Sequence, residues 1–248
     1  MGPLAILVGL LALDRLLVDG GRLARTVAGR RWQEARPVAI GYLRSAPVSS
    51  VYLFILLITT WVLQTSSAQI ANQLLLERST NLRQLARDPI RVLVASAFWL
   101  ETTWQLLAWA LLVLVIVVPL ERRLGSGRTI GVLATGHIGA TLLTAAGLWL
   151  ALRADAVEHS VTNAKDVGPS YAFFAAAGCL AFLLERRLRL WAVAALAGYA
   201  VLMVVVSTTF TDFGHLLAIA IGLACAPFTP PARARRARRG SEPGGSTG

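Results

Sequence analysis

Ser170 and His215 are the candidate catalytic residues, because a serine and a histidine can act together as nucleophile and base. Each lies near the start of a long stretch without charge. The stretch around Ser170 covers residues 167–184, and the stretch around His215 covers residues 213–232. A histidine beside a serine can take the hydroxyl proton and later return it to a leaving amine. The pair therefore predicts nucleophilic catalysis, and a helix cap or an interhelical hydrogen bond is the alternative role for Ser170.

The elements that must position this pair are predicted to be membrane-spanning helices. Of the 248 residues, 56% are apolar and 15% are charged, against roughly 45–50% and 25% in soluble domains. A membrane-spanning helix needs about 20 mainly apolar residues. The chain has six charge-free stretches, which are residues 45–76, 102–120, 129–152, 167–184, 190–211 and 213–232. We expect an all-α membrane protein, a bundle of six transmembrane helices, rather than a soluble enzyme, a disordered protein or a disulfide scaffold.

The positive charges indicate how this bundle is oriented. The formal net charge is +11, and 23 of the 24 basic residues are Arg. With the N-terminus in the cytoplasm, 18 basic residues fall in cytoplasmic segments and 6 in outer segments, as expected because positive residues resist translocation. We therefore predict a multi-pass protein with both termini in the cytoplasm. The Arg bias is typical of high-GC bacterial genomes, so the expected location is a bacterial plasma membrane, and the expected partner is the lipid bilayer and not nucleic acid.

Three regions are predicted along the chain. Residues 1–44 form an Arg-rich cytoplasmic or interfacial segment, in which the apolar run 3–13 is too short to span a membrane. Residues 45–228 form the membrane domain, and residues 229–248 form a disordered basic tail. The connection of roughly 27 residues after the first span is too long for a bare loop, so we expect it to lie partly in the membrane interface.

The predicted topology brings the candidate pair together. Both spans that carry it run from the outside inwards, so Ser170 and His215 lie at similar depth. The N–H groups at the helix start near Ser170 could hold a developing oxyanion. In the last span, Ala218 and Gly222 are small residues four positions apart, and this spacing lets two helices approach closely.

Other polar residues have simpler expected roles. His137 lies deeper in its span than Ser170, so a structural hydrogen bond is the expected role. Asp166 and Asp212 each precede a member of the pair by about one turn, and helix capping is expected for both. Glu101 could pair with Arg91 across the end of the loop. No Cys/His cluster has the spacing of metal ligands, and no cofactor is implied.

Three short motifs lie at the ends of the predicted spans. They are Glu121 to Ser126, then Gly168-Pro169-Ser170-Tyr171, then Gly214-His215 with Ala218 and Gly222. With these motifs the sequence resembles the rhomboid family of intramembrane serine proteases over about residues 48–228. That family has Glu-x-x-x-Gly-Ser after its second span, Gly-x-Ser-Gly at its nucleophile, and Ala-His followed by small residues in its last span. The resemblance implies a serine endopeptidase with Ser170 as nucleophile and His215 as base and acid. Its substrate would be another transmembrane helix.

Two departures from the family pattern bear on catalysis. The family's His-x-x-x-Asn pair, which helps to form the oxyanion hole, corresponds to Gln105 and Trp109. Gln105 could donate through its amide, whereas Trp109 offers only its indole N–H. Tyr171 replaces the glycine after the nucleophile, where its ring could obstruct the site or place a hydroxyl near His215. With Gln105, Gly168 and Tyr171 as supporting groups, we expect a peptidase, and the alternative is an inactive rhomboid-like protein that binds transmembrane clients.

Overall fold

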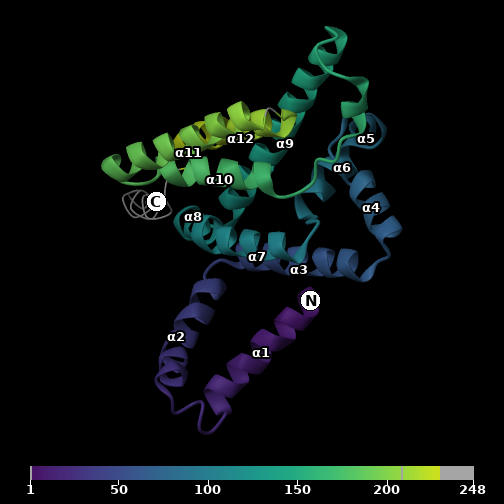
Figure 1. Cartoon of the computed structure of the whole chain (residues 1–248). Coiled ribbons are helices and arrows are strands. Elements are labelled where there is room, and N and C mark those ends of the chain that lie inside the picture. The colour runs from purple at the N-terminus through teal and green to yellow at the C-terminus, as the bar shows by residue number, and fades with distance from the viewer. Residues whose placement is uncertain (1, 208, 230–248) are drawn as a thin grey trace, which may run out of the picture.

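The computed structural model describes residues 2–207 and 209–229, and all regular secondary structure in these residues is helical. Within these described residues, five helices are long and apolar enough to cross a membrane. They are α3 (Pro47–Thr65), the continuous run Thr103–Leu124, α9 (Ser126–Arg153), α11 (Arg186–Val206) and the run Phe210–Phe228 (Figure 1). The chain is therefore a multi-pass helical membrane protein.

The helix that begins at Ser170 is shorter than the span expected from the sequence. This helix, α10 (Ser170–Phe182), has 13 residues, which gives a length of about 20 Å against about 30 Å of hydrocarbon. Nine of its residues are buried. It packs mainly against α9 and against α12 (Phe210–Cys225), so protein surrounds it and it does not need to match the bilayer. Six full spans therefore remain a prediction.

Small residues allow these three helices to pack closely. A Cβ atom at Gly222 of α12 would overlap the backbone of Ala175 in α10, and one at Gly136 of α9 would overlap the Ala175 side chain. Ala218 has no exposed surface. Close approach of backbones is how helices gain packing energy inside a membrane, so α9, α10 and α12 form the rigid centre that carries the candidate pair.

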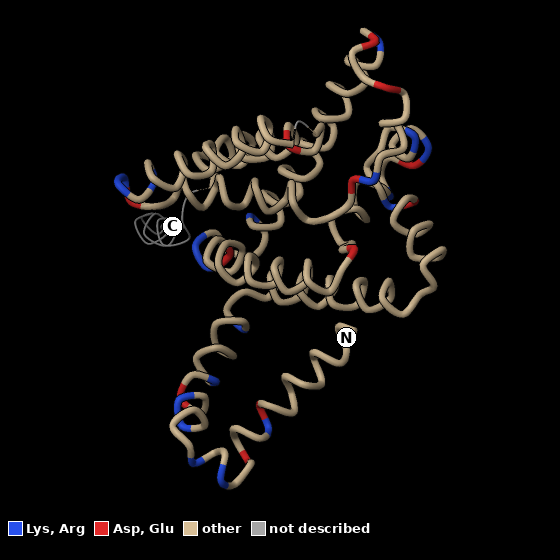
Figure 2. Tube along the Cα trace, in the orientation of Figure 1, with Lys and Arg blue, Asp and Glu red and all other residues tan. Residues whose placement is uncertain are grey.

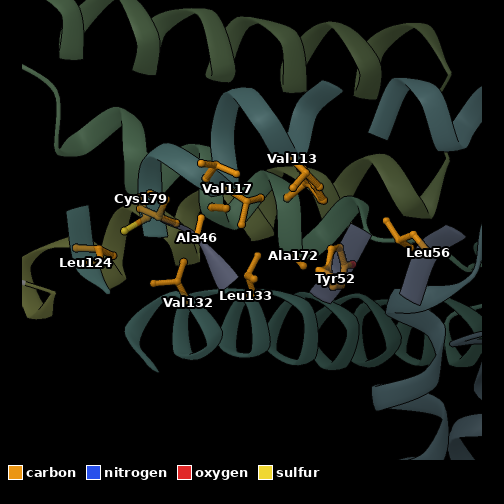
Figure 3. Packing of buried hydrophobic residues seen from close by; sticks show 14 of the residues in the cluster. Ala46, Tyr52, Leu56, Val113, Val117, Leu124, Val132, Leu133, Ala172 and Cys179 are labelled. Atoms are coloured by element: carbon orange, nitrogen blue, oxygen red, sulfur yellow. The ribbon is translucent and has the colours of Figure 1, made fainter. Parts of the chain in front are cut away.

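The second span is interrupted near its middle. It consists of α7 (Thr103–Leu112), a π-helical turn η2 (Val113–Val117) and α8 (Val118–Leu124). A π-turn leaves a carbonyl without its usual partner, and here the Tyr42 hydroxyl donates to the Leu114 carbonyl over 2.7 Å. Buried side chains of this span meet α3, α9 and α10 in one apolar core, which includes Tyr52, Leu133 and Ala172 (Figure 3).

Glu121 fastens three elements together at one end of the bundle. Its carboxylate accepts hydrogen bonds from the N–H groups of Val48 (2.9 Å) and Ser49 (2.8 Å) and from the Ser49 hydroxyl (2.7 Å). The Ser126 hydroxyl donates to the same carboxylate over 2.7 Å. An anion at a helix N-terminus is favourable because the free N–H groups point at it. The Glu121–Ser126 turn thus holds the start of α3 against the junction of α8 and α9.

The segment between α3 and the second span folds into short helices. They are α4 (Ala68–Glu77), α5 (Leu82–Arg87), α6 (Pro89–Ala95) and η1 (Ser96–Phe98). A further short turn, η3 (His159–Asn163), follows α9. The turn between α4 and α5 is fully or largely buried at Ser79, Thr80 and Asn81, so this segment packs onto the bundle and is not a bare connection.

A helical hairpin precedes the bundle. It is formed by α1 (Pro3–Asp19) and α2 (Val27–Arg44), and it extends away from α3 in Figure 1. The Asp14 carboxylate joins the two helices by accepting hydrogen bonds from Arg36 (2.8 and 3.2 Å) and from the Trp32 indole (2.9 Å). Figure 2 shows basic residues along α2 and the hairpin turn. The tail predicted for residues 229–248 lies outside the described residues apart from Thr229.

Candidate functional site

Ser170 is the first residue of α10. The chain enters this helix through Gly168, whose φ of 128° lies in a region that favours glycine. The Gly168 N–H donates to the Ser96 carbonyl over 2.9 Å, so it is already used. The first helical hydrogen bond runs from the Phe173 N–H to the Pro169 carbonyl. The N–H groups of the first turn, including that of Ser170, therefore remain as the backbone donors at this point.

His215 lies on α12, five residues after the helix begins. Its ring packs between Tyr171, with centroids 5.6 Å apart, and Phe174, with centroids 4.5 Å apart. Both ring nitrogens are buried, and neither has a hydrogen-bond partner among the described residues. The Asp212 carboxylate lies 3.8 Å from Nδ1, beyond hydrogen-bond length. Within the same residues no hydrogen bond joins Ser170 to His215.

Tyr171 and Gly214 fit each other across the two helices. A Cβ atom at Gly214 would overlap the ring and hydroxyl of Tyr171. The Tyr171 side chain is 2% exposed and packs with Ala140 and Ala218. After the serine, tyrosine stands where the rhomboid pattern has glycine, and before the histidine, glycine stands where the pattern has alanine. The missing Cβ atom at Gly214 leaves space that part of the Tyr171 ring occupies.

Asp166 holds the Tyr171 ring in place from the loop before α10. Its carboxylate accepts hydrogen bonds from the hydroxyls of Thr80 (2.8 Å), Tyr171 (3.2 Å) and Thr211 (3.5 Å). Its backbone carbonyl also accepts from the Thr80 N–H over 2.9 Å. Removal from water raises the pKa of the Asp166 carboxyl, and the three hydroxyl donors offset part of that rise. Asp166 is thus a junction between the α4–α5 turn, α10 and α12, whereas the sequence predicted a helix cap.

Gln105 is occupied at the start of α7. Its Oε1 accepts hydrogen bonds from the N–H groups of Glu101 (2.8 Å) and Thr102 (3.2 Å), and the Gln105 N–H donates to the Thr102 hydroxyl. This reciprocal arrangement is a capping box. Gln105 is exposed. Trp109 packs its ring on Phe173 with centroids 4.9 Å apart, so the described contacts of both side chains lie away from Ser170.

The remaining polar candidates have structural partners. The His137 Nε2 lies 2.9 Å from the Ser96 hydroxyl, and both residues are buried. Glu101 forms its ion pair with Lys165, at 3.8 Å, and not with Arg91. In the part of the chain that the structure describes, no three His, Cys, Asp or Glu side chains are placed to hold a metal ion.

Sequence reasoning overlooked three contributors to this site. Phe174 lies four residues after Ser170 on α10, and that spacing alone places it on the same helix face. Gly214 was treated only as a motif residue, although its lack of a side chain admits the Tyr171 ring. Thr80 belongs to a polar trio, Ser79 to Asn81, inside an apolar connection, and this was the available signal for a buried contact.

Comparison with known families identifies most of the chain. A family model described as rhomboid-like protein matches residues 41–236. No curated protein and no solved structure matches the chain. The matched range begins near the end of α2 and includes Glu121, Ser170 and His215.

Proposed function

Because this chain belongs to the rhomboid-like protein family, we propose that it binds transmembrane segments of client proteins beside Ser170 and His215 without hydrolysing them. The observation that carries this proposal is the Tyr171 ring, which contacts His215 and whose hydroxyl is bonded to Asp166. Gly214 provides the matching space on α12. Because His215, Asp166 and Gly214 all contact the Tyr171 side chain, a substrate could not easily displace the ring.

The oxyanion donors give a second argument. The amide oxygen of Gln105 caps α7, and the Gly168 N–H is bonded to Ser96. These contacts hold the Gln105 side chain at the start of α7, so the first-turn N–H groups of α10 are the donors that lie next to Ser170. Loss of one oxyanion donor costs roughly 10²–10³ in rate in a serine protease, so hydrolysis at this site would be slow.

Packing around α11 supports lateral binding of a client helix. Of the 21 residues of α11, only Ala200 is buried. Its Tyr199 stacks on Phe174 with centroids 5.6 Å apart, and Phe174 in turn packs on His215. A client helix that docks beside α11 would therefore contact Tyr199, whose ring is connected through Phe174 to His215.

The second candidate function is serine endopeptidase activity, which the state of His215 favours. Buried polar atoms without a partner are rare in proteins, and both ring nitrogens of His215 are in this state. In this case Ser170 attacks the scissile carbonyl, His215 takes its proton and returns it to the leaving amine, and water then releases the acyl group. Catalytic hydrogen bonds often shorten only when substrate binds.

We place this function in a bacterial plasma membrane with both termini in the cytoplasm. The support is the distribution of arginines, which gather along α2, at the end of α8 and at the start of α11 (Figure 2). Positive residues of short loops remain on the cytoplasmic side.

One experiment separates the two functions. The full chain in proteoliposomes is treated with a fluorophosphonate probe, and a photo-cross-linking residue at Tyr199 is used to capture transmembrane clients. If the protein binds clients without hydrolysing them, transmembrane proteins should be cross-linked and none should be cleaved. The fluorophosphonate probe should then label the wild type no more than it labels Ser170→Ala. A cross-linker at Leu143, an exposed position of α9, is the control. Ser170-dependent labelling together with cleavage of a transmembrane substrate would establish the peptidase instead, and equal capture from both positions would refute client binding at this site.

A further inference from the structure

A groove of about 450 Å³ lies between α3 and α9, apart from the Ser170 site. Its lining includes the buried residues Tyr52, Leu133 and Ala172, which are labelled in the core view of Figure 3, and residues of α6 and η1 also line it. Val51 and Ile130 line it and are 58% and 52% exposed. Both walls belong to candidate membrane spans, so the groove opens sideways on the surface that faces the bilayer.

We propose that this groove binds one acyl chain of an anionic phospholipid, whose headgroup lies at the Arg-rich end of the bundle. The proposal rests on the polarity, length and charge of the groove, and it is independent of whether Ser170 is catalytic.

Most polar groups that line the groove already have partners, and the exception is the buried Nδ1 of His137. The Tyr52 hydroxyl donates to the Ala97 carbonyl over 2.7 Å, and the Ser126 hydroxyl donates to Glu121 over 2.7 Å. His137 shares its Nε2 with the Ser96 hydroxyl. The other lining residues are apolar. A surface of this kind suits a hydrocarbon chain, which brings no polar group that would need a partner.

The length of the groove matches one leaflet. Along α9 it extends from Ser126 to Ile138, and along α3 from Pro47 to Ile55. At 1.5 Å per residue these distances are about 18 and 12 Å. The hydrocarbon core is about 30 Å thick, so one leaflet contributes about 15 Å. A single acyl chain that enters from one surface is therefore long enough to follow the groove over its length.

The charge at the open end selects the headgroup. Arg44 is exposed and lies three residues before Pro47, where the groove begins. Arg122 is also exposed and belongs to the Glu121–Ser126 turn, which ends at the groove residue Ser126. Its guanidinium carbon lies 5.1 Å from the centroid of the Tyr42 ring. Each arginine near the membrane surface attracts anionic lipid. A phosphate whose charge is not balanced by a choline would be preferred here.

Native mass spectrometry of the delipidated full chain tests the proposal with dioleoylphosphatidylglycerol and dioleoylphosphatidylcholine as probes. We expect one tightly held phosphatidylglycerol, bound several-fold better than phosphatidylcholine. Ala134→Trp fills the groove and should remove that lipid, whereas Leu143→Trp, at an exposed position of α9 outside the groove, should keep it. Arg44→Gln should reduce the preference between the two lipids. Equal retention by the two tryptophan variants would overturn the proposal.

A second measurement needs no variant and so cannot fail through misfolding. Phosphatidylglycerol with a diazirine in its acyl chain is photolysed in the presence of the wild-type chain, and the insertion sites are mapped by peptide mass spectrometry. Insertion is expected at Val51 and Ile130. The lipid proposal would be contradicted if insertion were equally frequent at exposed positions outside the groove, such as Leu143 and Val205. It would also be contradicted if a co-purified peptide occupied the groove and blocked its labelling.

Discussion

The fit between Tyr171 and Gly214 predicts strong coupling between two substitutions. In Gly214→Ala, the new methyl group would overlap the Tyr171 ring. The ring is 2% exposed, and its hydroxyl is bonded to Asp166, so it cannot swing aside freely. Overpacking of this kind typically costs 1–3 kcal/mol. We expect Gly214→Ala to lower the free energy of unfolding by about 2 kcal/mol, as typical overpacking does.

The same methyl group should be harmless once the ring is gone. Tyr171→Gly removes a buried aromatic side chain, and such truncations cost roughly 3–5 kcal/mol. In that background a methyl at position 214 meets the vacated space, so Gly214→Ala should then cost close to nothing. The interaction free energy between the two sites is therefore expected to be about 2 kcal/mol, within the usual range for residues in contact.

Unfolding by sodium dodecyl sulfate in mixed micelles, followed by tryptophan fluorescence, measures the four free energies of this cycle. Gly131→Ala on α9 is a matched control, because a Cβ there meets nothing within contact distance. If Gly214→Ala cost the same in both backgrounds, Tyr171 would not fill the space beside Gly214, and the argument that the ring is built into the site would fail. The double variant, which restores the family residues, also shows whether the ring suppresses fluorophosphonate labelling of Ser170.

Three further predictions concern the supports of the site. The folded-state pKa of Asp166 is raised above its ordinary value of 3.8, so the folded state binds that proton more tightly than the unfolded state does. The stability of the wild type relative to Asp166→Asn should therefore fall as pH rises above about 4. If the melting temperatures of the two proteins changed in parallel from pH 4 to 8, this prediction would be wrong. Glu121→Gln weakens hydrogen bonds that a charged acceptor receives from two elements, α3 and α9, each worth about 1.5–3 kcal/mol. The mixed-micelle assay should therefore show a loss of at least about 2 kcal/mol, and an unchanged stability would exclude the carboxylate as a structural clamp. Ala218→Leu should destabilise by about 1–3 kcal/mol through overpacking against Ala140 and Tyr171, whereas Phe213→Leu at a half-exposed position should change little.

Features set by local spacing could be predicted from the sequence. The sequence predicted that Ser170 lies near the start of its helix, and the structure begins α10 at that residue, with Pro169 as the N-cap. The rhomboid-like assignment rested on three short motifs and is confirmed by the family match. The expected hydrogen bond of His137 required only that a buried polar group has a partner, although its partner, Ser96, could not be named in advance.

Features that depend on distant contacts could not be predicted in this way. Asp166 looked like a cap because caps are local, whereas its partners Thr80 and Thr211 lie far away in the chain. Gln105 shows the opposite case, because Thr102 three residues before it is the sequence signature of a capping box. Reading it through the family pattern directed attention to Ser170 instead. The length of α10 also depended on tertiary context, because only a helix enclosed by protein can end inside the bilayer thickness.

Tyr171, Gly214 and Asp166 are best understood as one physical unit. Tyrosine in place of glycine on α10 requires space on α12, which Gly214 supplies. The phenol then carries its hydroxyl into a poorly solvated position, where it needs an acceptor, and Asp166 is that acceptor. The carboxylate in turn needs further donors, which Thr80 and Thr211 provide from two other segments. The ring, the space beside Gly214 and the acceptor at Asp166 therefore depend on one another as a single packed and hydrogen-bonded arrangement. This interdependence supports the proposal that the Tyr171 ring is a fixed part of a site that binds clients without hydrolysing them.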